Sequence, residues 1–276
     1  MTGISGNAAG GAYRDILLYV DDDLVHAAMQ QSNRGNGRNH AAMTSSSSIS
    51  QLCAVLCSFS IGRECQNHHA AREPLQRRFE VMARTTPGAI AVAFNGRRLT
   101  YGELDEQADA LALHLQDRGL APGSFCVLDL EPSLAQVRAV LAVLKAGAAW
   151  LQIDHRLARE AAAAVLAVVR PSFRLTRRAA PADGAPNAMR AVCCDEDATD
   201  LPYGWADELP VGARTPACAF ASLSDQRDLC ISVRTHHAIG ASLERETAPR
   251  RTQVADADTS RLWRHLSRGA QVTIPA

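Results

Sequence analysis

The chain has no excess of charge of either sign, since its 276 residues include 29 Lys and Arg and 29 Asp and Glu. This balance gives no electrostatic reason to expect binding to nucleic acid or to an acidic membrane surface. No run reaches the roughly 18 apolar residues that a membrane-spanning helix needs. Aromatic residues make up only 5% of the chain, so we expect a core built mostly from Ala, Val and Leu.

The cysteines give little sign of metal binding, because none of the eight forms a Cys-x-x-Cys pair. The nearest approach to a metal-ligand set has a spacing that matches no common zinc pattern, so we expect no metal site. That set comprises Cys53, Cys57, Cys65, His68 and His69. The cysteine pattern favours a reduced, cytoplasmic setting.

The composition changes near residue 74. Residues 1–73 are rich in Gly, Asn, Ser and His, so we expect a largely irregular or disordered extension before the folded unit, residues 74–276. Within the extension, DILLYVDDDLV (15–25) is similar to the Tyr-Val-Asp-Asp hairpin of reverse transcriptases, where Asp21 and Asp22 would bind Mg²⁺. Only 20 residues precede Asp21 and no palm domain follows, so an acidic helix start or turn is favoured.

Regular patterns begin after residue 73. Apolar spacing predicts a helix over PLQRRFEVMART (74–85), and Asn95-Gly96 predicts a tight turn after a strand at 89–94. Thr100 and Glu103 form the capping box of the next helix.

The same alternation continues along the chain. Strands are expected at 125–130, 148–153 and 173–176, and a helix at 159–169. Another helix begins at Ser133, which forms a capping box with Gln136, and it ends at Gly147. Its inward stripe consists of Val137, Val140, Leu141 and Leu144. Alternating strands and helices imply βαβ crossovers and a parallel sheet, so the fold class is α/β.

Lys145 is the only lysine of the chain. It lies two residues before the glycine that ends its helix, where a cation meets the negative end of the helix dipole. We therefore interpret it as a helix-end residue, and we assign no catalytic residue.

Two motifs in the run from Leu75 to Thr176 carry a resemblance to a known family. LTYGELDEQADALALHL (99–115) is similar to the Leu-Thr-Tyr-x-Glu-Leu motif of nonribosomal peptide synthetase adenylation domains, which belong to the AMP-binding, adenylate-forming enzymes. LKAGAAWLQID (144–154) is similar to their Leu-Lys-Ala-Gly-x-Ala-Tyr motif, with Trp150 as the aromatic residue and Asp154 at its end. The resemblance implies a partial large subdomain of that fold, truncated and degenerate.

The resemblance also implies an activity. In this family ATP and an amino acid react to give an aminoacyl-adenylate and pyrophosphate, and Mg²⁺ and a Gly-rich loop bind the phosphates. The acyl group then passes to the phosphopantetheine thiol of a carrier protein. By this resemblance, Ser222, Ser224 and Arg227 are the remnant of the phosphate loop, and the family's glycines and lysine are missing from it. Asp225 would add a negative charge beside a phosphate.

A weaker match follows at residues 255–276. There Asp256 takes the place of the family's aspartate that receives the substrate's amino group, while a solvated acid near a helix start is an equally good interpretation. Two hypotheses stay open. The chain is either an incomplete amino-acid-activating fragment that is inactive alone, or a non-catalytic pseudoenzyme or interaction module. The missing strands of such a fragment predict exposed sheet edges.

Overall fold

The computed structural model describes residues 2–7, 13, 15–20, 73–177, 189–194, 211–225, 227–245, 251–253 and 259–274. Within these ranges, none of the helices is long and apolar enough to span a membrane.

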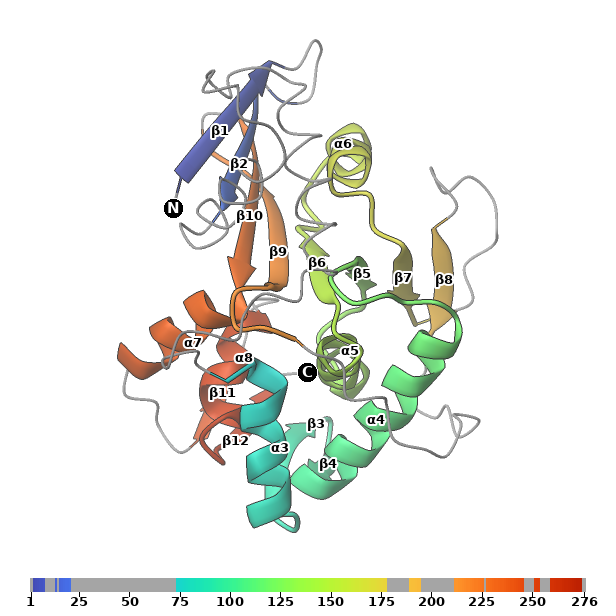
Figure 1. Cartoon of the computed structure of the whole chain (residues 1–276), viewed down its shortest axis with the longest axis vertical. Coiled ribbons are helices and arrows are strands. Elements are labelled where there is room, and N and C mark those ends of the chain that lie inside the picture. Colours follow the sequence, from blue (N-terminus) through green and yellow to red (C-terminus); the bar gives the residue numbers. More distant parts are fainter. Residues whose placement is uncertain are drawn as a thin grey trace, which may run out of the picture.

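Among the described residues, eight strands form one mixed sheet in the order β1-β2-β10-β9-β6-β5-β7-β8 (Figure 1). The strands from β9 to β8 are parallel, whereas β10 is antiparallel to β9 and β1 is antiparallel to β2. Their bounds are β1 (Thr2–Asn7), β2 (Asp15–Val20), β5 (Phe125–Asp129), β6 (Ala149–Ile153), β7 (Phe173–Thr176), β8 (Arg190–Cys193), β9 (Pro216–Leu223) and β10 (Leu229–Thr235).

A smaller sheet has the order β11-β12-β3-β4 among the described strands. Its members are β11 (Arg251–Gln253), β12 (Gln271–Ile274), β3 (Ile90–Phe94) and β4 (Arg97–Thr100). The pair β3 and β4 is the predicted hairpin, and Asn95 and Gly96 adopt the positive φ angles, 47° and 77°, that a tight turn of this kind requires.

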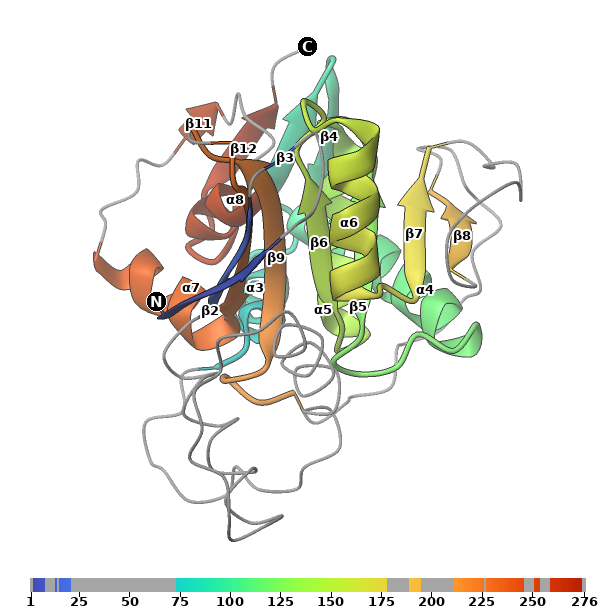
Figure 2. The same cartoon turned by 90° about the horizontal axis from the view of Figure 1, so that it is seen from above.

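The helices lie on both faces of the larger sheet. α6 (Arg159–Val169) packs on one face, where Val165 shares a buried cluster with Val127 and Leu151. α5 (Leu134–Lys145) packs on the other face and also contacts β3, so it lies between the two sheets (Figure 1). In Figure 2, the view from above, α6 lies over the strands of the larger sheet. The remaining helices are α3 (Leu75–Thr85), α4 (Tyr101–Asp117), α7 (His236–Arg245) and α8 (Thr259–Leu266).

Local signals in the sequence explain where several helices begin. Thr100 caps α4 through the complete capping box with Glu103, which confirms that prediction. Ser133 accepts a hydrogen bond from the Gln136 backbone, but the Gln136 side chain donates to the Leu130 carbonyl instead of returning to the cap. The second capping box is therefore only half formed.

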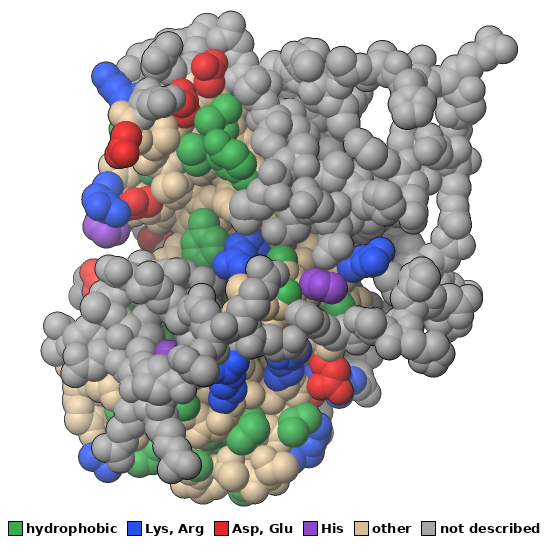
Figure 3. Space-filling view, turned by 90° about the vertical axis from the view of Figure 1, so that its left-hand side faces the viewer, with side chains coloured by type: hydrophobic (Ala, Val, Ile, Leu, Met, Phe, Trp, Pro, Cys, Tyr) green, Lys and Arg blue, Asp and Glu red, His purple; other side chains and the backbone are tan. Residues whose placement is uncertain are grey.

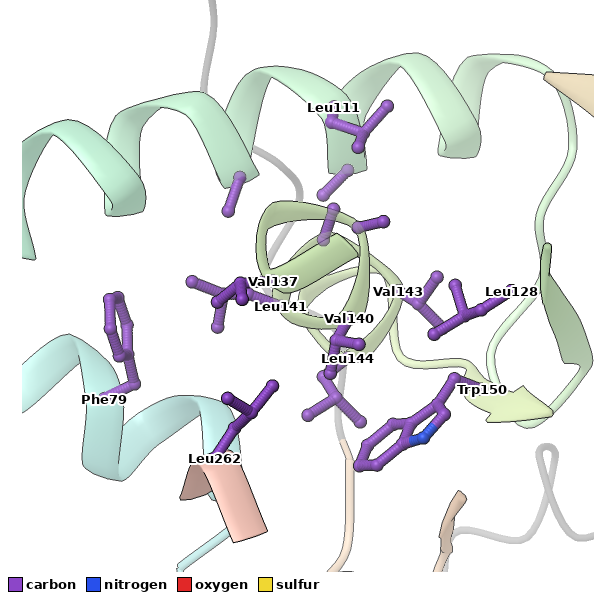
Figure 4. Close-up of a cluster of buried hydrophobic side chains, with 14 of the residues drawn as sticks. Phe79, Leu111, Leu128, Val137, Val140, Leu141, Val143, Leu144, Trp150 and Leu262 are labelled. Carbon is purple, nitrogen blue, oxygen red and sulfur yellow. The ribbon is translucent and has the colours of Figure 1, made fainter. Parts of the chain in front are cut away.

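α5 is buried on every side, which the expected single inward stripe did not predict. All of its residues are buried, including Arg138 and the helix-ending Lys145. Figure 4 shows the reason, because its side chains point toward Phe79 and Leu262 on one side and toward Leu128 and Trp150 on others. A helix placed between two sheets and flanked by α3, α4 and α8 has no solvent-facing side.

Two segments of the extension that we expected to be largely irregular are strands. β2 comprises residues 15–20 of the segment 15–25 that resembles the reverse-transcriptase hairpin, and it pairs in parallel with β10. β1 pairs with β2 from the outside. The outer edge of β10 is therefore covered by the chain's own residues, although we expected exposed sheet edges in this fold.

Candidate functional site

The hairpin loop of residues 224–228 joins β9 to β10 at the carboxyl edge of the parallel strands. Ligands of open α/β sheets bind at this edge. The backbone N–H of Asp154 donates to the Ala221 carbonyl at 2.9 Å, so the turn after β6 lies beside the loop. The structure thus brings the sequence-predicted residues Ser222, Ser224 and Arg227 to one end of the sheet.

The three predicted residues differ in exposure. Ser222 is exposed near the end of β9, and Ser224 is half-buried. Arg227 is exposed and has a φ of 65°, in the left-handed region that a non-glycine residue seldom adopts.

The described backbone N–H groups of the loop are largely used within the loop itself. Ser224 N–H donates to the Asp228 carbonyl at 2.9 Å, and Arg227 N–H donates to the Ser224 carbonyl at 2.9 Å. Asp228 N–H donates to the Ser224 hydroxyl oxygen at 3.0 Å. A phosphate-binding loop needs such groups to point outward.

Carboxylates lie within the loop and level with its end. Asp225 is exposed, Asp228 closes the loop, and the parallel pairing of Ile16 with Leu229 places Asp15 level with Asp228. On the neighbouring turn, a hydrogen bond from Arg156 lowers the pKa of Asp154. On the face shown in Figure 3, described side chains of both signs are interspersed, so no single-sign patch marks a site there.

The segment after β10 is organised by a buried histidine that the sequence did not single out for this role. His236, the first residue of α7, is only 2% exposed, and its Nδ1 accepts a hydrogen bond of 3.2 Å from the Leu75 N–H. Leu75 begins α3, whose N-cap offers no side-chain acceptor. Burial lowers the pKa of His236 to about 3, so the ring stays neutral and ties α7 to the start of α3.

Lys145 lies in a buried ionic cluster, which we define as Lys145, Asp105, Asp109 and Glu80. Its Nζ is 2.7 Å from Asp109, 2.8 Å from Asp105 and 3.7 Å from Glu80. The position at the end of α5 agrees with the helix-end interpretation, but the cation contacts side chains of α3 and α4. Burial by itself would lower the pKa of Lys145, and the two aspartates outweigh it and raise that pKa.

Several sequence predictions fall outside the described residues. These are Asp256, the pair Asp21 and Asp22, and the Cys53, Cys57, Cys65, His68 and His69 set. In the part of the chain that the structure covers, no three His, Cys, Asp or Glu side chains are arranged to hold a metal ion.

The fold defines an α/β protein with a hairpin loop at the carboxyl edge of its parallel strands, and comparison with known proteins identifies its family. Residues 79–226, slightly more than half of the chain, match the AMP-binding enzyme family. The chain belongs to this family.

The relatives are nonribosomal peptide synthetases. Chondramide synthase cmdD of Chondromyces crocatus is 34% identical over 151 residues, covering 54% of this chain and 4% of that protein. The dimodular nonribosomal peptide synthase of Bacillus subtilis is 39% identical over 102 residues, which cover 37% of this chain and 4% of that protein. The chain therefore spans only a small fraction of these synthases.

Solved structures agree on the fold. The nonribosomal peptide synthetase FmoA3 in its AMPPNP-bound form superposes with a TM-score of 0.65 at 25% identity, covering 81% of this chain and 24% of that one. The N-terminal subdomain of Klebsiella oxytoca NpsA gives a TM-score of 0.62 at 21% identity, covering 73% of this chain and 55% of that one. The predicted resemblance to the N-terminal part of an adenylation domain is confirmed.

Proposed function

We propose that this chain is a fragment of an amino-acid-activating adenylation domain of nonribosomal peptide synthesis that forms no aminoacyl-adenylate by itself. The observation that carries the second half of this proposal is the β9–β10 loop. Three of its N–H groups, those of Ser224, Arg227 and Asp228, donate within the loop. No glycine lies between Ser222 and Leu229, and the loop contains no lysine. These residues do not fit the triphosphate of ATP.

Electrostatics supports the same conclusion. Asp15, Asp225 and Asp228 lie at the loop or level with its end and outnumber Arg227, the one cation of the loop sequence, so the triphosphate would add negative charge to acidic surroundings. Repulsion between like charges grows as water is excluded, so an acidic loop weakens nucleotide binding most where a tight site would form.

The first half of the proposal rests on the relatives. FmoA3 was solved with AMPPNP, an analogue of ATP, and with alpha-methyl-L-serine-AMP. NpsA was fused to ThdA as an adenylation-PCP di-domain. These are the classes of partner of the domain from which we propose that this chain derives, namely ATP with Mg²⁺, an amino acid and a phosphopantetheine carrier protein, in the cytoplasm. The loop argues against ATP binding by the chain itself.

Amino-acid-dependent exchange of pyrophosphate into ATP tests this proposal. The full chain, assayed with Mg²⁺ and a panel of amino acids beside an active adenylation domain as positive control, is expected to give no exchange above the no-enzyme background. Robust exchange by the chain alone would overturn the proposal.

A second arm separates the fragment from a non-catalytic module. The remainder of an adenylation domain, expressed as a separate chain, is added to this one. Exchange that appears only with both chains supports a fragment that contributes to activity. Carrier-protein binding without exchange in either arm instead favours the pseudoenzyme or interaction module.

A further inference from the structure

β2 covers the outer edge of β10 with residues from outside the family match. The pairing is parallel and runs from Ile16 opposite Leu229 to Val20 opposite Val233. The match to the AMP-binding family covers residues 79–226, so β2 and β10 both lie outside the matched segment. β2 reaches β10 from a distant, earlier point in the chain.

Packing as well as backbone pairing holds β2 in place. Leu18 and Val20 are 0% and 1% exposed and lie in the same buried cluster as Ile231 and Val233. Leu17, which points to the other face, is only half-buried. The strand is therefore attached to β10 through one apolar face.

Without β2, β10 would be an unpaired edge strand of the larger sheet, able to pair with β10 of a second copy of the chain. It is seven residues long, and Leu229, Ile231 and Val233 form a continuous apolar face. An unpaired edge of this length and character is a template for strand addition, and a second copy would present the same edge. Pairing of two identical edges gives a closed two-fold dimer.

We infer that residues 15–20 are an intramolecular cap of the β10 edge, which prevents β10 from pairing with β10 of a second copy of this chain. The cap is separable from the main core, because its buried side chains belong to the cluster on the α6 face, whereas the core around α5 lies on the other face. This inference does not depend on whether the chain binds ATP.

A pair of aspartate substitutions in β2 tests the cap in the full chain. Leu18→Asp places a charge in the contact with β10, and Leu17→Asp places the same charge on the half-buried face of the same strand. Hydrogen–deuterium exchange is followed for residues 229–235 and for residues 134–145, and light scattering after size exclusion gives the mass. Leu18→Asp is expected to speed exchange of β10 markedly relative to Leu17→Asp, to leave α5 protected, and to form dimers as concentration rises.

A cross-link tests the register and the cap together. Cys230 lies directly opposite Leu17, so oxidation of Leu17→Cys is expected to join the two positions, whereas Tyr19→Cys, opposite Ser232, gives no such link. Burial and, to a smaller extent, the negative charge of Asp228 raise the pKa of the Cys230 thiol, so the oxidation is run in alkaline buffer. The double variant Leu17→Cys/Leu18→Asp, once oxidised, should then stay monomeric, because the disulfide holds β2 on the β10 edge.

Each other outcome counts against the inference. If Leu18→Asp behaves as Leu17→Asp does, β2 does not protect the β10 edge. If α5 loses protection together with β10, the strand belongs to the common core and is no separable cap. If β10 opens and the chain stays monomeric at all concentrations, or if Cys230 links equally well to position 19, the proposed role or register is wrong.

Discussion

Replacing Lys145 with methionine removes the one cation from the buried ionic cluster. The Lys145 side chain is 5% exposed and the Asp109 side chain 11% exposed, and their charged atoms are 2.7 Å apart. Removing one partner of a buried ion pair costs about 3–5 kcal/mol, because the remaining charge is left in a poorly solvated place. Since Asp105 and Glu80 keep partial access to water, at 17% and 16%, we expect a loss of about 3 kcal/mol in the free energy of unfolding at pH 7.

The loss in the free energy of unfolding should depend on pH, and the pKa of Asp109 gives the direction. Burial raises the pKa of Asp109 above its ordinary 3.8, so the folded chain takes up this proton at higher pH than the unfolded chain does. Protonated Asp109 stabilises the folded chain fully at pH values below the ordinary pKa of 3.8, which applies to the unfolded chain. This stabilisation is lost as pH rises through the raised pKa of the folded chain. Without Lys145 that pKa rises further, so the cost of Lys145→Met should be smaller at pH 5 than at pH 7.

Urea unfolding followed by far-UV circular dichroism measures these differences. Arg77→Met is the matched control, because Arg77 is 40% exposed and forms a surface pair with Glu80 at 3.3 Å, so its loss should stay under about 1 kcal/mol. Adding Asp109→Leu to Lys145→Met should restore much of the stability. A loss below about 1 kcal/mol for Lys145→Met at pH 7, or one that is equal at pH 5 and pH 7, would refute the reasoning.

Three further substitutions test local features by the same unfolding assay. Gly96→Ala should cost about 1 kcal/mol because φ is 77° in open space, whereas Gly88→Ala, also in open space, should not destabilise; equal effects would contradict this. Tyr101→Phe should cost about 1–2 kcal/mol, because its buried hydroxyl lies within hydrogen-bond distance of two carbonyls, and a neutral result would show that these bonds contribute nothing. Burial lowers the pKa of His236 to about 3 from 6.5, so the stability that it contributes is present above pH 6.5 and lost as pH falls toward 3. His236→Asn should flatten the fall in stability between pH 6.5 and about pH 4, and an unchanged slope would exclude this role.

Features that depend on neighbours in the sequence were predictable. The Asn95-Gly96 turn needs only two residues that tolerate positive φ, and the Thr100 cap needs only a glutamate three positions later. The alternation of apolar segments also indicated the parallel arrangement of β5, β6 and β7.

Features that depend on distant partners were not predictable from the sequence. The inward stripe predicted for α5 is buried, but the prediction was incomplete because two sheets and three helices meet on this helix, and no local pattern records that encounter. The partners of Lys145 come from two other helices, with Asp109 36 positions away. The pairing of residues 15–20 with β10 joins segments far apart in the chain, and no local pattern records it.

The loop shows how local sequence and long-range structure combine at the candidate site. Sequence alone located the missing glycines and lysine, but only the structure shows that the Ser224 hydroxyl and carbonyl, with the Asp228 carbonyl, accept three hydrogen bonds within the loop. Each such bond contributes about 1 kcal/mol, so turning these N–H groups outward would cost about 3 kcal/mol, or roughly a hundredfold in affinity. Replacing Asp225 by glycine would remove one charge and leave those bonds in place. That single change should therefore not create ATP binding in this chain, and binding after it would show that charge, rather than loop closure, is the barrier.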